Sequence, residues 1–224
     1  MPTVKPVVKN AAFALLAALV VVVALAGCAS APSPSTVAKE TLDAIKAQDF
    51  EKMKSHYAGS VDDVSISSLA GNVSGFDVSS LSEEDGAMVK ELIGVMTSFD
   101  YELGTEAING DTATVDATIS TYDLGTVFSE AMGDYFTDVV TNVLSGGSID
   151  EAEMKEQFIA KFKEKLAQHT EKTHTEKVTL NLTKTDGEWK MDSFDEQTVD
   201  AFMGGLISSA KSFTDQLESL GSAL

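Results

Sequence analysis

The sequence predicts an α+β fold in which helices pack on a curved antiparallel sheet built from two hairpins. Apolar and polar residues alternate over residues 101–119 and again over 178–191, as half-buried strands require. Asparagine-glycine and aspartate-glycine turn signals interrupt these two stretches. Before, between and after them, apolar residues recur every three or four positions, which is the spacing of amphipathic helices. We expect one α+β domain over residues 36–224, with a helical pair and a C-terminal helix added to the sheet.

Composition excludes several classes of function. The 224 residues include 35 acidic and 16 basic side chains, the net charge is −19, and every basic side chain is lysine. Nucleic-acid binding depends on neutralising phosphates, so we expect no nucleic-acid partner. A single cysteine can form neither an internal disulfide nor a multi-thiolate zinc site. Acidic clusters such as Glu83-Glu84-Asp85 could hold calcium, but none has the spacing of an EF-hand loop, so we expect no metal site and no cofactor.

The first 27 residues have the pattern of an export signal. Lys5 and Lys9 precede sixteen consecutive apolar residues at 11–26. A plain transmembrane anchor is the alternative, because the 21 residues from Ala11 to Ala31 carry no charge and about 20 suffice to span a bilayer.

The end of this segment favours a lipoprotein. Leu25-Ala26-Gly27-Cys28 contains the only cysteine of the chain and resembles the lipobox of bacterial lipoproteins, in which the cysteine is lipidated and the signal is cut just before it. The resemblance implies cleavage between Gly27 and Cys28 and an anchor on the extracytoplasmic face of the cell membrane. Residues 28–35 are small, polar or proline, and we interpret them as the lipidated cysteine and a flexible tether.

Helices are predicted before the first hairpin. Apolar spacing predicts a helical pair over 36–57, with a kink at Gln48-Asp49 and Asp49 as an N-cap. Residues 58–81 follow no period, and we expect them to be irregular. Ser82 to Asp85 resembles a capping box that opens a further helix.

The register of the first hairpin follows from parity. Its apolar positions are all odd-numbered, so opposed residues must sum to an even number if one face is buried. This predicts a three-residue loop, Ile108-Asn109-Gly110, with Gly110 in the left-handed region.

In the second hairpin the two strands have opposite parity. A two-residue turn at Asp186-Gly187 is therefore predicted, with Leu182 opposite Met191 and Lys184 opposite Trp189.

Between the hairpins, two apolar stripes predict an antiparallel helical hairpin. The first spans residues 124–143; the second follows a capping box at Ser148 to Glu151 and runs to Leu166. A last helix is expected to start at Ser193, and Gly204-Gly205 in its middle predicts either a bend or a very close neighbour.

Three segments together carry a resemblance to a family. They are Val37 to Met53, Asn109 to Val115, and Asp186-Gly187-Glu188-Trp189-Lys190, and they are similar to the nuclear transport factor 2-like (cystatin-like) domains of Gram-positive lipoproteins. The resemblance implies a cone-shaped pocket between the helices and the sheet. The helical pair at 124–168 and the C-terminal helix depart from the family pattern and could plug or replace that pocket. The candidate pocket residues are Tyr57, Tyr101, Leu103, Val115, Ile119 and Trp189.

Catalysis is not expected. Some relatives in that superfamily are isomerases or dehydratases with an aspartate or histidine on the concave sheet face, but the core-facing positions here carry no carboxylate and no imidazole. Asp116 has the parity of the opposite, solvated face. His169 and His174 follow a lysine-rich helix end, which favours interaction with the helix dipole over a metal pair.

Three functions remain open. The first is a cell-surface binding or accessory lipoprotein for a small apolar ligand or an envelope protein, with Phe158 and Phe162 on the candidate partner surface because the helical pair is more apolar than a sheet cover requires. The second is a structural envelope protein with a filled core. The third is a pocket enzyme of isomerase or dehydratase type.

Overall fold

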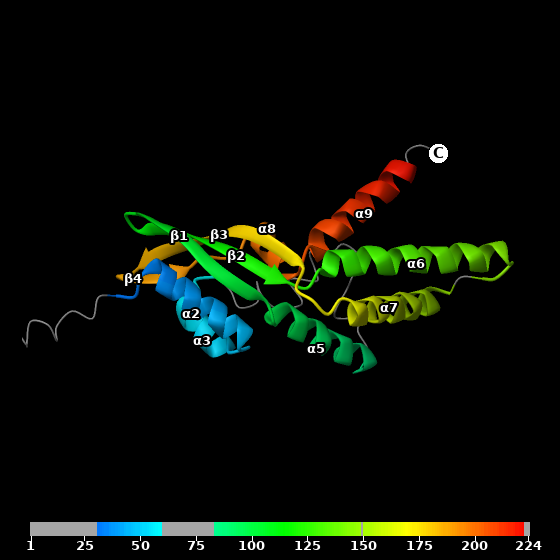
Figure 1. Cartoon of the computed structure of the whole chain (residues 1–224), viewed down its shortest axis with the longest axis horizontal. Helices are drawn as coiled ribbons and strands as arrows, with labels where there is room; N and C mark the ends of the chain where they lie inside the picture. Colours follow the sequence, from blue (N-terminus) through cyan, green and yellow to red (C-terminus); the bar gives the residue numbers. More distant parts are fainter. Residues whose placement is uncertain (1–30, 60–82, 149, 222–224) are drawn as a thin grey trace, which may run out of the picture. The chain divides into compact units, whose positions relative to one another are not determined.

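The computed structural model describes residues 31–59, 83–148 and 150–221 (Figure 1). The chain divides into two units, Met1–Pro32 and Ser33–Leu224, and every element below belongs to the second. The predicted α+β class is confirmed, because helices pack on an antiparallel sheet. Among the described residues, no helix combines the length and the apolar character needed to cross a membrane.

Four antiparallel strands form the sheet in the order β1-β2-β3-β4. They are β1 (Asp100–Asn109), β2 (Thr112–Thr121), β3 (His174–Thr185) and β4 (Glu188–Met191). Alternate side chains of β2 and β3 point into the core, whereas Asp116 is exposed on the other face, as predicted. The buried apolar members of these two strands are Ala113, Val115, Ala117, Ile119, Val178, Leu180 and Leu182.

In the first hairpin the predicted loop is wrong. Asn109 pairs with Thr112, so the loop has two residues, of which Gly110 has the predicted left-handed conformation at φ 64°. Tyr101 nevertheless faces Ile119, so the odd-numbered positions share a face as parity required. A β-bulge reconciles the two observations, because Gly104 and Thr105 together oppose one residue of β2. The bulge also leaves Thr105 exposed.

The second hairpin matches its prediction. Leu182 pairs with Met191 and Lys184 with Trp189 around a two-residue loop. Asp186 and Gly187 both have positive φ, 53° and 86°, as a type I′ turn requires.

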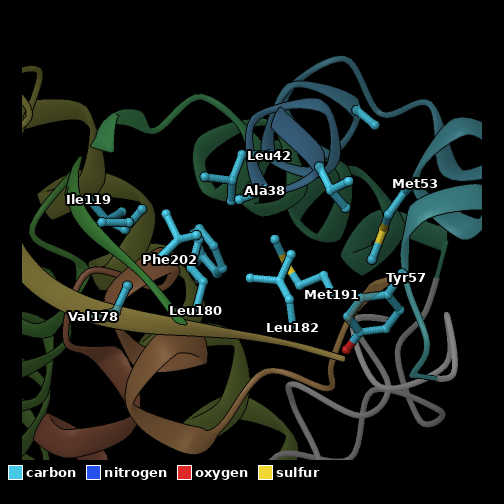
Figure 2. Close-up of a cluster of buried hydrophobic side chains, with 14 of the residues drawn as sticks. Ala38, Leu42, Met53, Tyr57, Ile119, Val178, Leu180, Leu182, Met191 and Phe202 are labelled. Carbon is cyan, nitrogen blue, oxygen red and sulfur yellow. The ribbon is translucent and has the colours of Figure 1, made fainter. Parts of the chain in front are cut away.

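The first core lies between one face of the sheet and the N-terminal helices. Helices α2 (Pro34–Lys46) and α3 (Phe50–His56) are separated by Gln48, whose φ is 54°, and the Asp49 side chain caps α3 by accepting from the Lys52 amide at 3.0 Å. The predicted kink and N-cap are therefore confirmed. Figure 2 shows side chains of α2, α3 and the sheet meeting in this core, including Leu42, Met53, Leu180, Leu182 and Met191.

A second core joins the remaining helices. It unites residues of α5 (Glu83–Thr97), α6 (Leu124–Leu144), α7 (Glu151–Gln168), α8 (Glu196–Phe202) and α9 (Leu206–Gly221). Figure 1 shows α6 and α7 side by side, as the predicted helical hairpin requires. The fully buried members of the second core include Leu124, Val127, Ala131 and Ile207.

The caps of the later helices differ from prediction by two residues. Asp150 rather than Ser148 accepts the first-turn amide of α7, from Glu153 at 3.2 Å. Asp195 rather than Ser193 caps α8, accepting from Thr198 at 2.8 Å. A carboxylate adds a favourable charge at the helix N-terminus, which favours aspartate over the earlier serine. Ser82 and most of the stretch predicted to be irregular lie outside the described residues.

Gly204 and Gly205 satisfy both alternatives raised by the sequence. They interrupt the C-terminal helix between α8 and α9, with φ of 59° and 77°. A Cβ at Gly204 would also lie 1.9 Å from the Tyr122 carbonyl oxygen, so the backbone there has a very close neighbour. The Asp200 carboxylate accepts from the Ile207 amide at 2.8 Å and thereby caps α9.

Candidate binding groove

Most of the candidate pocket residues belong to the packed first core. Val115 and Ile119 are fully buried, and Tyr57 and Trp189 are nearly so. Tyr57 is held by its hydroxyl, which accepts from the Phe194 amide at 3.2 Å, and by its ring, which lies 5.4 Å from that of Phe194. None of these four lines either groove described below, and each packs among apolar side chains of the first core. Their assignment to a ligand pocket stays a prediction.

Tyr101 is half-buried and donates its hydroxyl to Asp43 Oδ1 at 2.7 Å. Hydrogen bonds from Lys39 and from Tyr101 lower the pKa of the Asp43 carboxyl below its usual value. Burial, and then the hydrogen bond to Asp43, raises the pKa of Tyr101. The phenol therefore stays protonated at neutral pH, and the pair ties α2 to β1 rather than supplying a general base.

The candidate partner surface at Phe158 and Phe162 is corrected. Phe162 is 4% exposed and belongs to the second core. Phe158 is half-buried, with its ring 6.0 Å from that of Phe128, 6.2 Å from that of Tyr135 and 6.2 Å from that of Phe162. Both phenylalanines close α7 onto α6 instead of facing outward.

Ion pairs reinforce the closure of α7 on α6. Asp134 lies 2.8 Å from Lys165, and Asp138 lies 3.0 Å from Lys161. His169, predicted to act on the helix dipole, has its Nε2 3.1 Å from a Glu130 carboxylate oxygen. The charged side of α6 is thus occupied by α7.

The surplus apolar surface lies on α6. Its distal half carries the α6 stripe, four exposed apolar residues at helical spacing: Phe136, Val140, Val143 and Leu144. Val140 is 52% and Leu144 83% exposed. Residues 139–148 contain no charged side chain. The exposed apolar surface thus lies on the predicted helical pair, but on α6 and not at Phe158 and Phe162 of α7.

The α6 stripe continues into a groove between α6 and α9. The α6–α9 groove has a volume of about 360 Å³, and it is lined by Phe128, Ser129, Met132, Gly133 and Phe136 of α6 and by Ser208, Ser209, Ser212, Phe213 and Gln216 of α9. The Phe136 and Phe213 rings lie 5.5 Å apart and form its apolar floor. Figure 1 shows the two helices separating from a common starting point.

A second groove, of about 430 Å³, lies over the β-bulge on the open face of the sheet. Glu102, Asp116 and Lys177 line it together with threonine side chains, and Leu103 is the one candidate pocket residue that reaches it. Its charged walls are well solvated before any ligand arrives, whereas an apolar occupant of the α6–α9 groove would release water from aromatic surface. The α6–α9 groove is the stronger candidate for binding.

Within the described ranges, no three histidine, cysteine or carboxylate side chains gather closely enough to hold a metal ion. The histidines lie instead in separate pairs with glutamate: His56 is 3.2 Å from Glu40, and His174 is 3.5 Å from Glu176.

Comparisons with known proteins place the chain in no family. No family model matches the sequence, and no curated protein matches it significantly. One solved structure, that of a candidate lipoprotein (ycdA) from Bacillus subtilis, is similar at 14% identity and a TM-score of 0.45, over 76% of this chain and 57% of that protein. A likeness at this level does not bear on function.

Proposed function

We propose that this chain is a lipid-anchored protein of the extracytoplasmic face of the cell membrane, and that it binds a partner through the α6–α9 groove and the α6 stripe without catalysing a reaction. The observation that carries the binding role is the continuity of an apolar groove with exposed apolar residues of the same helix. Large contiguous apolar patches on soluble proteins mark sites that meet a partner or a ligand.

Anchoring is supported by the sequence of the first 28 residues. A charged start, an uncharged apolar run and a lipobox-like Leu25-Ala26-Gly27 approach lead to the only cysteine, Cys28. Diacylglycerol and a further acyl chain supply the two or more hydrocarbon chains that stable anchoring needs.

The absence of catalysis is supported by the character of the first core. The strand positions where a pocket enzyme would place its acid or base hold buried apolar side chains, such as Val115, Ile119 and Leu180. Tyr101, which faces this core from β1, is held protonated beside Asp43.

A structural envelope role is the second candidate. It is favoured by the burial of Tyr57 and Trp189 among the apolar side chains of the first core. The two candidates differ at the α6 stripe, because a structural role gives Val140 and Val143 no partner.

Two experiments in the native cells test the proposal. Replacing Cys28→Ala should abolish labelling by radioactive palmitate and release the chain from the membrane fraction; unchanged labelling would exclude lipidation at Cys28. A photoreactive phenylalanine analogue at position 140 should give a discrete cross-linked adduct. The same analogue at Ile108, 56% exposed on the first hairpin, is the control. Adducts at both positions or at neither would contradict the binding role of the groove.

A further inference from the structure

The occupant of the α6–α9 groove must be apolar on the side that enters it. No lysine, aspartate or glutamate lines the groove, and the α6 stripe beyond it is also uncharged. A buried charge without a partner is costly, so a charged ligand group would gain nothing from this lining.

The lining also has the shape that receives a helix. Small residues recur four positions apart on both walls, at Ser129 and Gly133 on α6 and at Ser208 and Ser212 on α9. Such spacing lets a third backbone approach closely. A Cβ at Gly133 would meet nothing within 4 Å, so that position is open space. The α6 stripe extends this lining through Val140 and Leu144, a length that suits a helix better than a compact ligand.

Charge determines the flanks of the occupant. The chain has a net charge of −19, and within the described ranges no basic group lies within ion-pair distance of Asp215 or Glu218 on the exposed part of α9. A second copy of the chain would bring like charges together, and anionic lipid headgroups would be repelled in the same way. Basic residues beside an apolar face complement both the groove and its surroundings.

We propose that the occupant is an amphipathic helix of another protein, with lysine or arginine flanking its apolar face. This rests on the proposed function and names its partner class. The apolar face lies along Phe136 and Val140, and the basic flanks face the acidic surface outside the groove.

The test uses the full chain in neutral phosphatidylcholine nanodiscs, with empty nanodiscs as the blank. Three synthetic peptides are titrated by calorimetry: a helix with leucine on one face and lysine on the other, the same helix with glutamate for lysine, and a scrambled lysine peptide of identical composition. The first should bind at least about tenfold more tightly than either of the others.

Charge-neutral variants separate groove binding from general attraction to an acidic protein. Gly133→Leu fills the groove, and Val140→Ser with Val143→Ser removes part of the stripe; each should weaken the lysine helix about tenfold or more. Gly94→Leu on α5 and Ile108→Ser are the matched controls, because Gly94 also faces open space and Ile108 is equally exposed. Both controls should bind as the unaltered chain does.

Several results would overturn the proposal. They are equal binding of lysine and glutamate helices, binding that the groove variants leave unchanged, absence of binding by the lysine helix, and self-association of the chain that Gly133→Leu abolishes. None of these results decides the proposed function. That function is tested separately by photo-cross-linking at position 140, which does not depend on the charge of the partner.

Discussion

The backbone N–H of Gly125 donates a hydrogen bond to the carbonyl oxygen of Gly204 at 2.9 Å. Gly125 lies in the first turn of α6, where amide groups have no hydrogen-bond partner within the helix. Gly204 follows the end of α8, where carbonyl groups have no partner within the helix. The bond therefore gives each of these two groups its hydrogen-bond partner. Because α9 begins two residues later, this bond fixes the origin from which α6 and α9 separate, and hence the groove between them.

The first prediction concerns Gly204→Ala. This substitution places a methyl group 1.9 Å from the Tyr122 carbonyl oxygen in a backbone with φ of 59°, so both a clash and a strained conformation result. We expect a loss of about 3 kcal/mol or more in the free energy of unfolding. Gly146→Ala is the control for strain alone, since its φ is 80° but its Cβ would meet nothing within 4 Å. It should cost only about 1 kcal/mol. Equal losses in urea unfolding would mean that the close approach at Gly204 is not maintained.

The sheet shows where sequence reasoning succeeds and where it fails. Parity identified which residues share a face, because a buried face constrains alternation strongly, and it gave the second hairpin its register. In the first hairpin, parity predicted the wrong loop length. A parity argument assumes that every residue of one strand faces one residue of the other, and the bulge at Gly104 and Thr105 adds one unpaired residue to β1. The only sign of this bulge in the sequence is an isolated glycine.

The second prediction follows from that bulge. Deleting Gly104 removes the extra residue, so regular pairing can run from Glu106 opposite Val115 to Leu103 opposite Ala117. We expect the deletion variant to fold and to keep cross-strand NMR contacts between Tyr101 and Ile119. Deleting Thr114 from the central strand should instead abolish folding, because part of the strand would turn its apolar side chains outward. Loss of the Tyr101 contacts in the first variant would show that the bulge sets the register.

The helical hairpin held a signal that the apolar pattern did not reveal. The acidic residues Glu130, Asp134 and Asp138 step by four along α6, while their partners step by four in the opposite direction along α7 and the residue that follows it. That complementarity marks the side of α6 that faces α7. The apolar stripe at Val140 and Val143 lies away from it, which the sequence could have indicated. The position of α9 could not be predicted in this way, because it depends on the contact of Gly204 with Gly125 across distant segments.

The third prediction separates the two faces of the helical hairpin. Phe162→Ala empties a site that is 4% exposed, and it should lower the free energy of unfolding by about 3–5 kcal/mol. Phe136→Ala, at a site 38% exposed, should cost about 1 kcal/mol while weakening the lysine helix in calorimetry. Thermal melts and titrations on the same preparations give both quantities. If Phe136→Ala lowers the free energy of unfolding more than Phe162→Ala does, then Phe136 is the buried side chain in solution and Phe162 the exposed one.

The fourth prediction is the pH dependence of the contact between α2 and β1. The pKa of the Asp43 carboxyl is held below its usual value of 3.8 by hydrogen bonds from Lys39 and Tyr101. A depressed folded-state pKa contributes stability above the unfolded value and loses it as the pH falls through the folded value. Asp43→Asn should therefore melt at a lower temperature than the unaltered chain at pH 6, and the gap should narrow as the pH falls below 3.8 and through the lowered folded-state pKa.

The comparison with Asp43→Asn removes the effect of the large net charge, which changes in parallel in both proteins as the carboxylates protonate. Asp111→Asn is the matched control, because within the described part of the chain the exposed Asp111 side chain makes no hydrogen bond or ion pair. Its melting temperature should follow that of the unaltered chain at every pH. A gap for Asp43→Asn that does not narrow at all as the pH falls below 3.8 would mean that its loss of stability comes from altered packing against Tyr101 and not from the carboxylate charge.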